Sequence, residues 1–320
     1  MSLLEIDDLS VTFRTDRGLL RAVDSVNLHV DSGETLAIVG ESGSGKSVTA
    51  LSILRLIGDN GSIERGAIRF DGTDLVGVSD DAIRDVRGDA IAMIFQEPMS
   101  SLNPVLTIGK QVAEPIWLHR KKPWSEALEQ AGELLKRVVI PDAIKRLDDF
   151  PHHFSGGMRQ RVMIAMALAC EPRLIIADEP TTALDVTVQA QILALLKELT
   201  REANSALILI THDLGVVARY ADRVAVMYAG RIVETASARD LYKNPQHPYT
   251  RGLMASIPGL DGEAGKRLQS IVGQPPDLAN LPSGCAFAPR CQFARNACRV
   301  APPPLESVGD AHQMACYGDE

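Results

Sequence analysis

The eight residues from Gly40 to Ser47 constrain this chain more than any other segment, because they fit the pattern G-x-x-x-x-G-K-[ST]. The apolar residues 35–39 before them predict a buried strand, and residues 48–57 after them, apolar and without glycine or proline, predict a helix. Between a strand and a helix, glycines let the backbone turn tightly, so that N–H groups and the helix N-terminus face an anion. The segment therefore predicts a loop that binds the phosphates of ATP or GTP.

Two side chains of this loop are expected to act directly on the nucleotide. Lys46 supplies a positive charge for the outer phosphates, and the Ser47 hydroxyl can bind Mg²⁺. The remaining small residues are expected to surround the phosphates: Gly40, Ser42, Gly43, Ser44 and Gly45.

Composition limits the classes of protein that the chain can belong to. Its 320 residues allow one large domain with an extension, or two domains, and 45% apolar residues indicate a folded protein. A net charge of −8 disfavours a nucleic-acid binder. The longest apolar run, Val162–Cys170, is far shorter than the roughly 20 residues of a membrane span, and no secretory signal is visible at the start. Membrane contact is therefore expected only through a partner.

The pattern of apolar residues predicts an α/β fold. Two short, continuous apolar runs, residues 174–177 and 206–210, are typical of central parallel strands that are buried on both faces. Alternating segments within residues 3–40 and hairpins at 62–75 and 224–234 add further strands. Residues 105–150 are polar and helical in pattern, as expected of an inserted subdomain.

Polar residues at the ends of the two buried strands are candidates for catalysis. Asp178 can hold Mg²⁺ through water, and Glu179 can orient or activate the attacking water. His212 ends the next strand at the same edge of the predicted sheet. Each of these residues alone could be an ordinary strand end, so their assignment depends on a further motif.

That motif is the segment from Phe154 to Gln160, in which Ser155, Gly156 and Gly157 precede an apolar helical stretch. Small residues at the start of a helix form an anion site, here without a lysine. With Gln96, residues 178–179, residues 182–185 and His212 in this order, the chain resembles the ATP-binding cassette (ABC) family from residue 3 to about 240.

The resemblance implies a RecA-like core with antiparallel β and helical subdomains, the helical one at about 97–170. It also implies a head-to-tail dimer that binds two ATP molecules. Each ATP lies between the phosphate loop of one subunit and residues 155–157 of the other.

The resemblance also assigns roles by position. Phe13 stacks on adenine, with a core phenylalanine as the competing interpretation. Gln96 binds Mg²⁺ together with Ser47 and Asp178, and contacts the membrane partner. Glu179 is the catalytic base, His212 contacts the γ-phosphate, and Asp185 links the two active sites.

One motif departs from the family pattern. Phe154 and Met158 stand where the family usually has leucine and glutamine. The residues that face the phosphate are kept, but the substitution of Met158 leaves open how well this half-site supports hydrolysis.

Two longer segments narrow the resemblance to importers of peptides and nickel: residues 96–104 and residues 244–251. The resemblance covers nearly the whole chain and is greatest to ATPases that drive dipeptide uptake. It implies an ATPase on the cytoplasmic face of the bacterial inner membrane, with two permeases and an extracytoplasmic solute-binding protein. The resemblance favours a second, non-identical ATPase, while the sequence leaves an identical one open. The peptide itself does not touch this chain.

Three alternatives to a peptide importer stay open at this point. The first is an importer of nickel or another small solute, because the partners select the cargo. The second is an ABC ATPase of translation or DNA repair, although such proteins usually have two cassettes or a long coiled coil. The third is an exporter ATPase, which residues 96–104 match poorly.

The cassette is expected to span residues 1–240 and a cysteine-rich extension residues 241–320. The extension contains Cys285, Cys291, Cys298 and Cys316, separated by five, six and 17 residues. Four cysteines in a segment with little apolar core suggest a metal site. Structural zinc usually needs C-x₂₋₄-C pairs, whereas an iron–sulfur cluster needs only four thiolates. Resemblance to peptide-importer ATPases favours a [4Fe–4S] cluster, with zinc or unmetallated thiols as alternatives. Cys170 is expected in the core.

Overall fold

The computed structural model describes every residue except 1, 17, 98–100, 183, 257–270 and 319–320. Its contacts divide the chain into two compact units. One unit, which we call the helical unit, comprises Asp31–Glu34 and Gly77–Ile210. The other comprises Ser2–Val30, Thr35–Val76 and Thr211–Glu320, and we call it the loop unit because it contains the phosphate loop.

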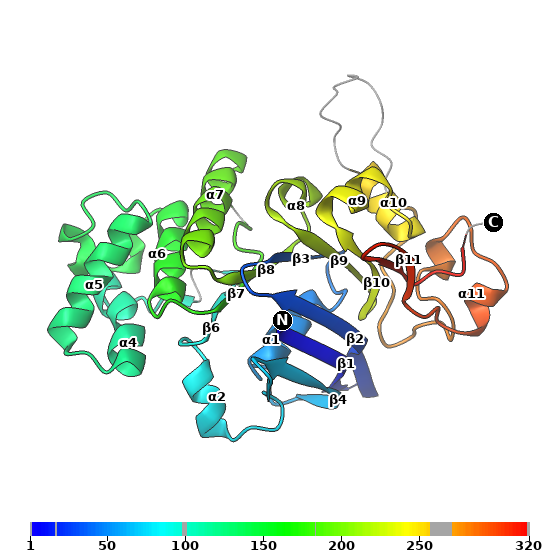
Figure 1. Ribbon diagram of the computed structural model, residues 1–320, viewed down its shortest axis with the longest axis horizontal. Coiled ribbons are helices and arrows are strands. Elements are labelled where there is room, and N and C mark those ends of the chain that lie inside the picture. The colour runs from blue at the N-terminus through cyan, green and yellow to red at the C-terminus, as the bar shows by residue number, and fades with distance from the viewer. Residues whose placement is uncertain (1, 17, 98–100, 183, 257–270, 319–320) are drawn as a thin grey trace. The chain divides into compact units, whose positions relative to one another are not determined.

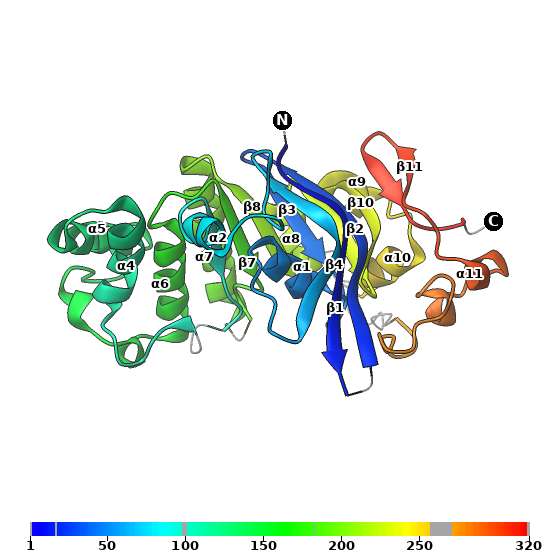
Figure 2. The same cartoon turned by 90° about the horizontal axis from the view of Figure 1, so that it is seen from below.

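The loop unit contains a four-stranded sheet in the order β2-β1-β4-β5, of which β1, β2 and β4 are labelled in Figure 2. Its strands are β1 (Ser2–Thr15), β2 (Gly18–Asp31), β4 (Gly61–Phe70) and β5 (Thr73–Asp74). Buried Val26, Leu28 and Val30 alternate with exposed neighbours, as expected of a strand with one face in the core. Asp71 and Gly72 both have positive φ and join the antiparallel strands β4 and β5, which confirms the hairpin predicted at 62–75.

A second group of strands in the loop unit includes β3 (Thr35–Val39), the strand that directly precedes the phosphate loop. This strand is wholly buried and pairs in parallel with β9 (Arg223–Tyr228). The strand β10 (Arg231–Ser237) follows β9 through Ala229 and Gly230, whose φ values of 49° and 82° suit a tight hairpin turn. The predicted hairpin at 224–234 is therefore confirmed.

The described residues after position 240, called the C-terminal segment below, extend this same sheet. The strand β12 (His312–Met314) pairs antiparallel with β10, and β11 (Glu306–Gly309) pairs with β12. The contacts place the described part of residues 241–320 in the same compact unit as β9 and β10. The predicted division of the chain at residue 240 stays a prediction.

The loop unit contains several short helices: α1 (Lys46–Ile53), α8 (Leu214–Tyr220), α9 (Ala238–Lys243), α10 (Pro248–Ala255), η3 (Ala288–Arg290) and α11 (Ala297–Val300). Of these, α8, α9 and α10 contribute residues to a core cluster with three aromatic rings. Tyr228 of β9, Tyr249 of α10 and Phe287 lie in one buried cluster with ring centroids 4.5 to 5.4 Å apart. Residues from the C-terminal segment thus complete the core beside β9.

The helix after the phosphate loop differs from its predicted range of 48–57. It begins at Lys46, because Gly45 adopts a positive φ of 103° and caps it. It ends at Ile53, and Arg55 two residues later has a left-handed φ of 49°. A left-handed residue cannot continue a right-handed helix, so the helix ends before the apolar run does.

The helical unit contains three parallel strands and a group of helices (Figure 1). The strands are β6 (Ile91–Ile94), β7 (Leu174–Asp178) and β8 (Ala206–Thr211). Every residue of β7 and β8 is buried, which confirms the strands predicted at 174–177 and 206–210. The helices are α2 (Asp80–Val86), α4 (Ile108–Arg120), α5 (Trp124–Arg137), η1 (Lys145–Asp148), η2 (Pro151–His153), α6 (Gly156–Leu168) and α7 (Val186–Glu202).

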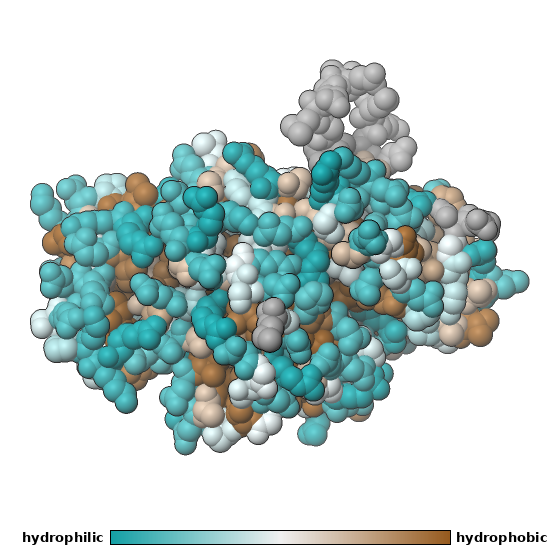
Figure 3. Space-filling view, in the orientation of Figure 1, coloured by the Kyte–Doolittle hydropathy of each residue, from teal (hydrophilic) through white to brown (hydrophobic). Residues whose placement is uncertain are grey.

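Residues 105–150 are helical, as predicted. Buried Ala127, Ala131, Leu134 and Leu135 lie on one face of α5, at the spacing of an amphipathic helix. The helices α4, α5 and α6 pack against one another. Hydrophilic side chains cover much of the outer surface over α4 and α5, with apolar patches between them (Figure 3). In the described part of the chain, no helix combines the length and the apolar character of a membrane span.

A buried carboxylate fixes the C-terminal segment on β10. Glu234 is fully buried and accepts hydrogen bonds from the backbone N–H groups of Gln246 and His247, at 2.7 and 2.9 Å. Its Oε1 atom lies 2.7 Å from Nε2 of buried His312 in β12. Each oxygen of the buried carboxylate therefore has a partner, as the cost of burying charge requires.

Next to this carboxylate, His247 caps α10 and predicts a pH dependence of stability. Its Nδ1 atom accepts the Tyr249 N–H at 3.0 Å, and burial, with a smaller effect of Arg251, lowers the pKa of His247 to about 4. Unfolded histidine has a pKa near 6.5, so below that pH the unfolded chain binds a proton that the folded chain excludes. We expect the free energy of unfolding to fall by roughly 3 kcal/mol between pH 6.5 and pH 4 through this group.

Urea unfolding at intervals from pH 7 to pH 4 measures this effect. His247→Asn is the matched variant, because asparagine also accepts at a helix N-cap but does not titrate. The stability difference between wild type and variant should shrink as pH falls. Parallel profiles for the two proteins would contradict the assignment.

Candidate functional site

Three glycines give the phosphate loop its backbone path. Gly40, Gly43 and Gly45 have φ values of 156°, 77° and 103°. A Cβ atom at Gly40 would lie 2.2 Å from the Met227 carbonyl oxygen, and one at Gly45 would lie 2.6 Å from that of Ala22. Any larger residue at these two positions would collide with backbone, so close packing as well as φ requires glycine here.

The loop folds around the lysine at its end. Lys46 is only 5% exposed, and its Nζ atom donates to the carbonyl oxygens of Gly40 and Glu41 at 2.8 and 2.9 Å. The Ser44 N–H also donates to Glu41, while the buried Ser44 hydroxyl has no hydrogen-bond partner among the described residues. A buried ammonium, an unsatisfied hydroxyl and a glycine backbone fit a polyphosphate, and Ser47 follows Lys46 in α1.

In the helical unit, the structure brings the predicted base and Gln96 together. Glu179 directly follows Asp178, the last residue of β7, and has a left-handed φ of 45°. Its Oε2 atom accepts hydrogen bonds from Gln96 Nε2 at 3.2 Å and from Thr182 Oγ1 at 2.9 Å. Its backbone N–H donates to Ile210 in β8. Hydrogen bonds therefore orient the carboxylate in the way a general base requires.

Sequence reasoning missed the role of Thr182. The residue belongs to the motif at 182–185, where no role was predicted for it. Its position three residues after Glu179 was the signal that could have indicated a contact between the two side chains. After a strand end, the chain turns back within three residues, and the Thr182 N–H donates to the Glu179 carbonyl oxygen at 3.2 Å. That turn places the threonine hydroxyl beside the carboxylate.

The Ser155–Gly157 segment begins helix α6, as predicted. Ser155 is the N-cap, and its hydroxyl accepts the Met158 N–H at 3.4 Å. A Cβ atom at Gly157 would lie 2.8 Å from a Val188 methyl group, so glycine allows α6 and α7 to approach closely. Phe154 is 2% exposed. An apolar residue is thus kept at this position of the motif, where the family usually has leucine.

Other predicted residues are placed, but their roles stay predictions. Asp185 caps α7 by accepting the Val188 N–H at 3.0 Å. His212 follows β8 and is exposed. Phe13 is half-buried in β1, and its ring lies against Gly61, where a Cβ atom would be 2.7 Å away. Of the segment 96–104, residues 98–100 lie outside the described residues, as does residue 183 of the segment 182–185.

The four cysteines of the C-terminal segment form no disulfide among the described residues. Burial raises the pKa of Cys285 above its ordinary value. The Cys285 N–H donates to the Cys298 carbonyl oxygen at 2.7 Å, so the two backbones are close. Yet among the described residues no three His, Cys, Asp or Glu side chains are grouped to hold a metal ion. The expected site at Cys285, Cys291, Cys298 and Cys316, with a [4Fe–4S] cluster or zinc, is therefore not supported.

Cys170 is buried, as expected for a core residue. Burial raises the pKa of its thiol to about 11. The thiol is therefore protonated at neutral pH, which suits a packing role.

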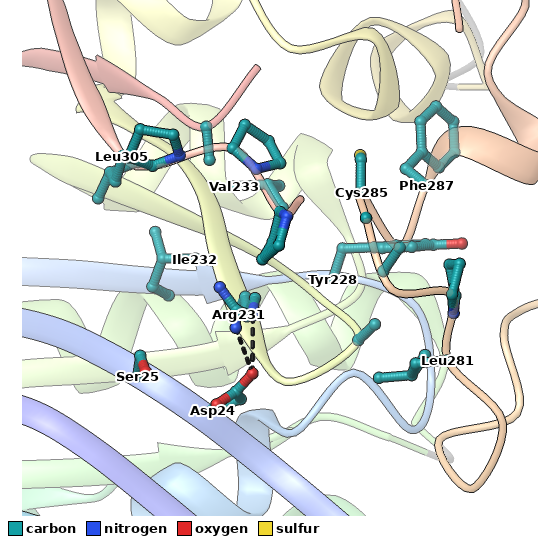
Figure 4. A pocket seen from close by; sticks show the side chains of 18 of the residues that line it. Asp24, Ser25, Tyr228, Arg231, Ile232, Val233, Leu281, Cys285, Phe287 and Leu305 are labelled. Carbon is teal, nitrogen blue, oxygen red and sulfur yellow. Dashed lines mark hydrogen bonds and ion pairs between the residues drawn. The ribbon is translucent and has the colours of Figure 1, made fainter. Parts of the chain in front are cut away.

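A cavity of about 430 Å³ lies in the loop unit between the C-terminal segment and β9–β10 (Figure 4). Tyr228, Cys285 and Phe287 line it on one side. Arg231 lies on another side and donates to the Asp24 carboxylate at 2.8 Å. The ion pair neutralises the polar wall, and the remainder of the lining is mainly apolar.

Comparison with known proteins agrees with this geometry. Residues 23–182 match the family model described as ABC transporter, and residues 233–298 match that of the oligopeptide/dipeptide transporter, C-terminal region. A dimeric ATP-binding cassette solved in a post-hydrolysis state with ADP and Pi has a TM-score of 0.66 and 30% identity, covering 74% of this chain and 99% of that one.

Two curated relatives cover almost the full chain. A putative peptide import ATP-binding protein of Brucella abortus is 54% identical over 98% of this chain and 96% of its own length. The oligopeptide transport ATP-binding protein OppD of Bacillus subtilis is 54% identical over 98% of this chain and 88% of its own length. The chain therefore belongs to the ABC transporter family of ATPases. Its P-loop cassette fold is the one that the phosphate loop and the Ser155–Gly157 motif predict.

The contacts of Glu179 lead to a test of its role. Replacing Glu179 with glutamine keeps the shape of the side chain but removes its ability to accept a proton. We expect ATP hydrolysis to slow by about 10²–10⁴-fold while ATP binding persists, measured by phosphate release and by nucleotide titration.

Glu198→Gln is the matched control, because Glu198 is an exposed residue of α7. The control should hydrolyse ATP at the wild-type rate. If Glu179→Gln were equally active, Glu179 could not be the base.

Proposed function

We propose that this chain is the ATP-hydrolysing subunit of an ABC importer that takes up di- or oligopeptides. The observation that carries the proposal is the match of residues 233–298 to the C-terminal region of oligopeptide/dipeptide transporters. This region lies beyond the cassette motifs, so it adds information that the phosphate loop alone does not contain. The names of the two relatives, covering nearly the full chain, support the same cargo.

The chain's own residues suggest how hydrolysis would proceed. Lys46 and the loop N–H groups would bind the outer phosphates. Ser47 and Gln96 would provide oxygen ligands for Mg²⁺, and Asp178 would hold it through water. When bound, Mg²⁺ neutralises negative charge on the transferred phosphoryl group. Glu179 then accepts a proton from the water that attacks the γ-phosphate, giving ADP and phosphate.

Other residues act at the dimer interface in this proposal. Ser155, Gly156 and Gly157 at the start of α6 face the ATP of the opposite subunit, and Asp185 links the two sites. His212 contacts the γ-phosphate, and Phe13 stacks on adenine. ATP binding would close the dimer and hydrolysis would reopen it.

In this proposal the chain hydrolyses ATP but does not bind the peptide, so partner proteins must bind and carry it. A second, non-identical ATPase would complete the dimer, two transmembrane permeases would carry the peptide, and an extracytoplasmic protein would deliver it. The chain would lie on the cytoplasmic face of the bacterial inner membrane, attached through the permeases. A metal in the cysteine segment forms no part of this proposal, because the described residues do not group to bind one.

Uptake by cells tests the cargo. Deleting the gene from its bacterium should abolish uptake of labelled di- or oligopeptides, while uptake of labelled Ni²⁺ continues. The wild-type gene should restore peptide uptake, and a gene encoding Glu179→Gln should not. Loss of nickel uptake with normal peptide uptake would overturn the proposed cargo.

A further inference from the structure

A buried arginine from the C-terminal segment binds the phosphate loop. Arg290, the last residue of η3, has a side chain that is only 6% exposed. Its Nη1 and Nη2 atoms donate to the two carboxylate oxygens of Glu41, at 2.6 and 3.0 Å. Glu41 is the second residue of the phosphate loop, so the pair joins segments 249 positions apart in the sequence. A two-point bond between guanidinium and carboxylate fixes orientation as well as distance.

The guanidinium is itself fixed by its surroundings. Its Nε atom donates to the Val272 carbonyl oxygen at 3.1 Å, and Nη1 also donates to the Tyr228 hydroxyl at 3.4 Å. The rings of Tyr228 and Phe287 each lie 5.9 Å from the guanidinium carbon, within reach of cation–π attraction. The bonds to Glu41 raise the pKa of Arg290 above its ordinary value, so the charge is permanent.

A second residue of the C-terminal segment holds Glu41 through its backbone. The Glu41 N–H donates to the Tyr249 hydroxyl oxygen at 2.8 Å, and Tyr249 is fully buried. Burial raises the pKa of this phenol, which therefore stays protonated. The tyrosine ring belongs to the same aromatic cluster as Tyr228 and Phe287. Both the side chain and the amide of Glu41 are thus bound by residues that follow position 240.

Glu41 in turn orients the part of the loop that faces phosphate. Its carbonyl oxygen accepts hydrogen bonds from Lys46 Nζ at 2.9 Å and from the Ser44 N–H at 3.2 Å. The same short chain of contacts therefore runs from Arg290 and Tyr249, through Glu41, to the ammonium group that binds phosphate. Binding groups held in place before the ligand arrives cost less to order, which raises affinity.

We propose that Arg290 and Tyr249 are positioning residues for the phosphate loop, so that tight ATP binding by this cassette depends on its C-terminal segment. The inference rests on the ATP-binding part of the proposed function and not on the peptide cargo. A purely structural role would attach the segment to the cassette without changing the loop. The two roles differ in what they predict for ATP affinity.

Titration calorimetry of the full-length chain with Mg²⁺ and ATP separates these roles. Arg290→Gln should raise the Kd for ATP about tenfold, the order of effect expected when a charge-assisted hydrogen bond is lost. Arg290→Lys should restore part of the affinity, because it keeps the charge but loses the two-point geometry. Tyr249→Phe, which removes only the hydroxyl, should raise the Kd as well and does not depend on the folding of the arginine variants.

His312→Gln is the matched control for attachment of the segment. His312 fixes β12 to buried Glu234, and among the described residues its side chain forms no hydrogen bond with the loop. This variant should lower the Tm while leaving the Kd for ATP at the wild-type value. The inference also requires that Glu41→Gln and Arg290→Gln together weaken binding no more than the stronger single change, because both remove one ion pair.

Two further results would overturn this inference without affecting the proposed function. They are wild-type affinity in Arg290→Gln, and a loss of affinity in His312→Gln equal to that in Arg290→Gln. A wild-type chain that binds no ATP would overturn the proposed function together with it.

Discussion

The structure depends on one constraint: several backbone N–H groups of the phosphate loop must point at a single anion. The backbone conformation that this requires is one that only glycine adopts without strain. Gly40 and Gly45 meet this constraint in close contact with backbone of Met227 and Ala22. The phosphate loop is therefore defined as much by the strands behind it as by its own residues. The buried strand β3 delivers the chain to the loop, and β9, its parallel neighbour, supplies Met227.

In each unit, polar contacts also hold a carboxylate in a fixed orientation. In the helical unit, Glu179 adopts a left-handed conformation and is fixed by Gln96 and Thr182. In the loop unit, the buried Glu234 binds the chain at Gln246 and His247 and the strand β12 through His312. In both places a carboxylate binds at least one side chain about 80 positions away, Gln96 for Glu179 and His312 for Glu234, so the fold helps to set its orientation.

Much of the fold and of the site could be predicted because their signals are local. Continuous apolar runs predicted β7 and β8, and the pairs Asp71–Gly72 and Ala229–Gly230 predicted hairpins. Small residues predicted the helix starts at Lys46 and Gly156, where the anion sites stay predictions. The contacts of Glu41 with Tyr249 and Arg290 join residues more than 200 positions apart, which no local pattern reveals. The metal site expected from the cysteine spacing gains no support among the described residues, because separation along the chain does not fix separation in space.

The span between Glu41 and Arg290 has a consequence for the order in which a working protein can arise. A ribosome finishes the phosphate loop early and reaches the arginine 249 residues later. A chain interrupted in between has every residue of the nucleotide motif but lacks the ion pair that holds its second residue. A product truncated before Arg290 therefore differs from a longer one at the site where ATP would bind.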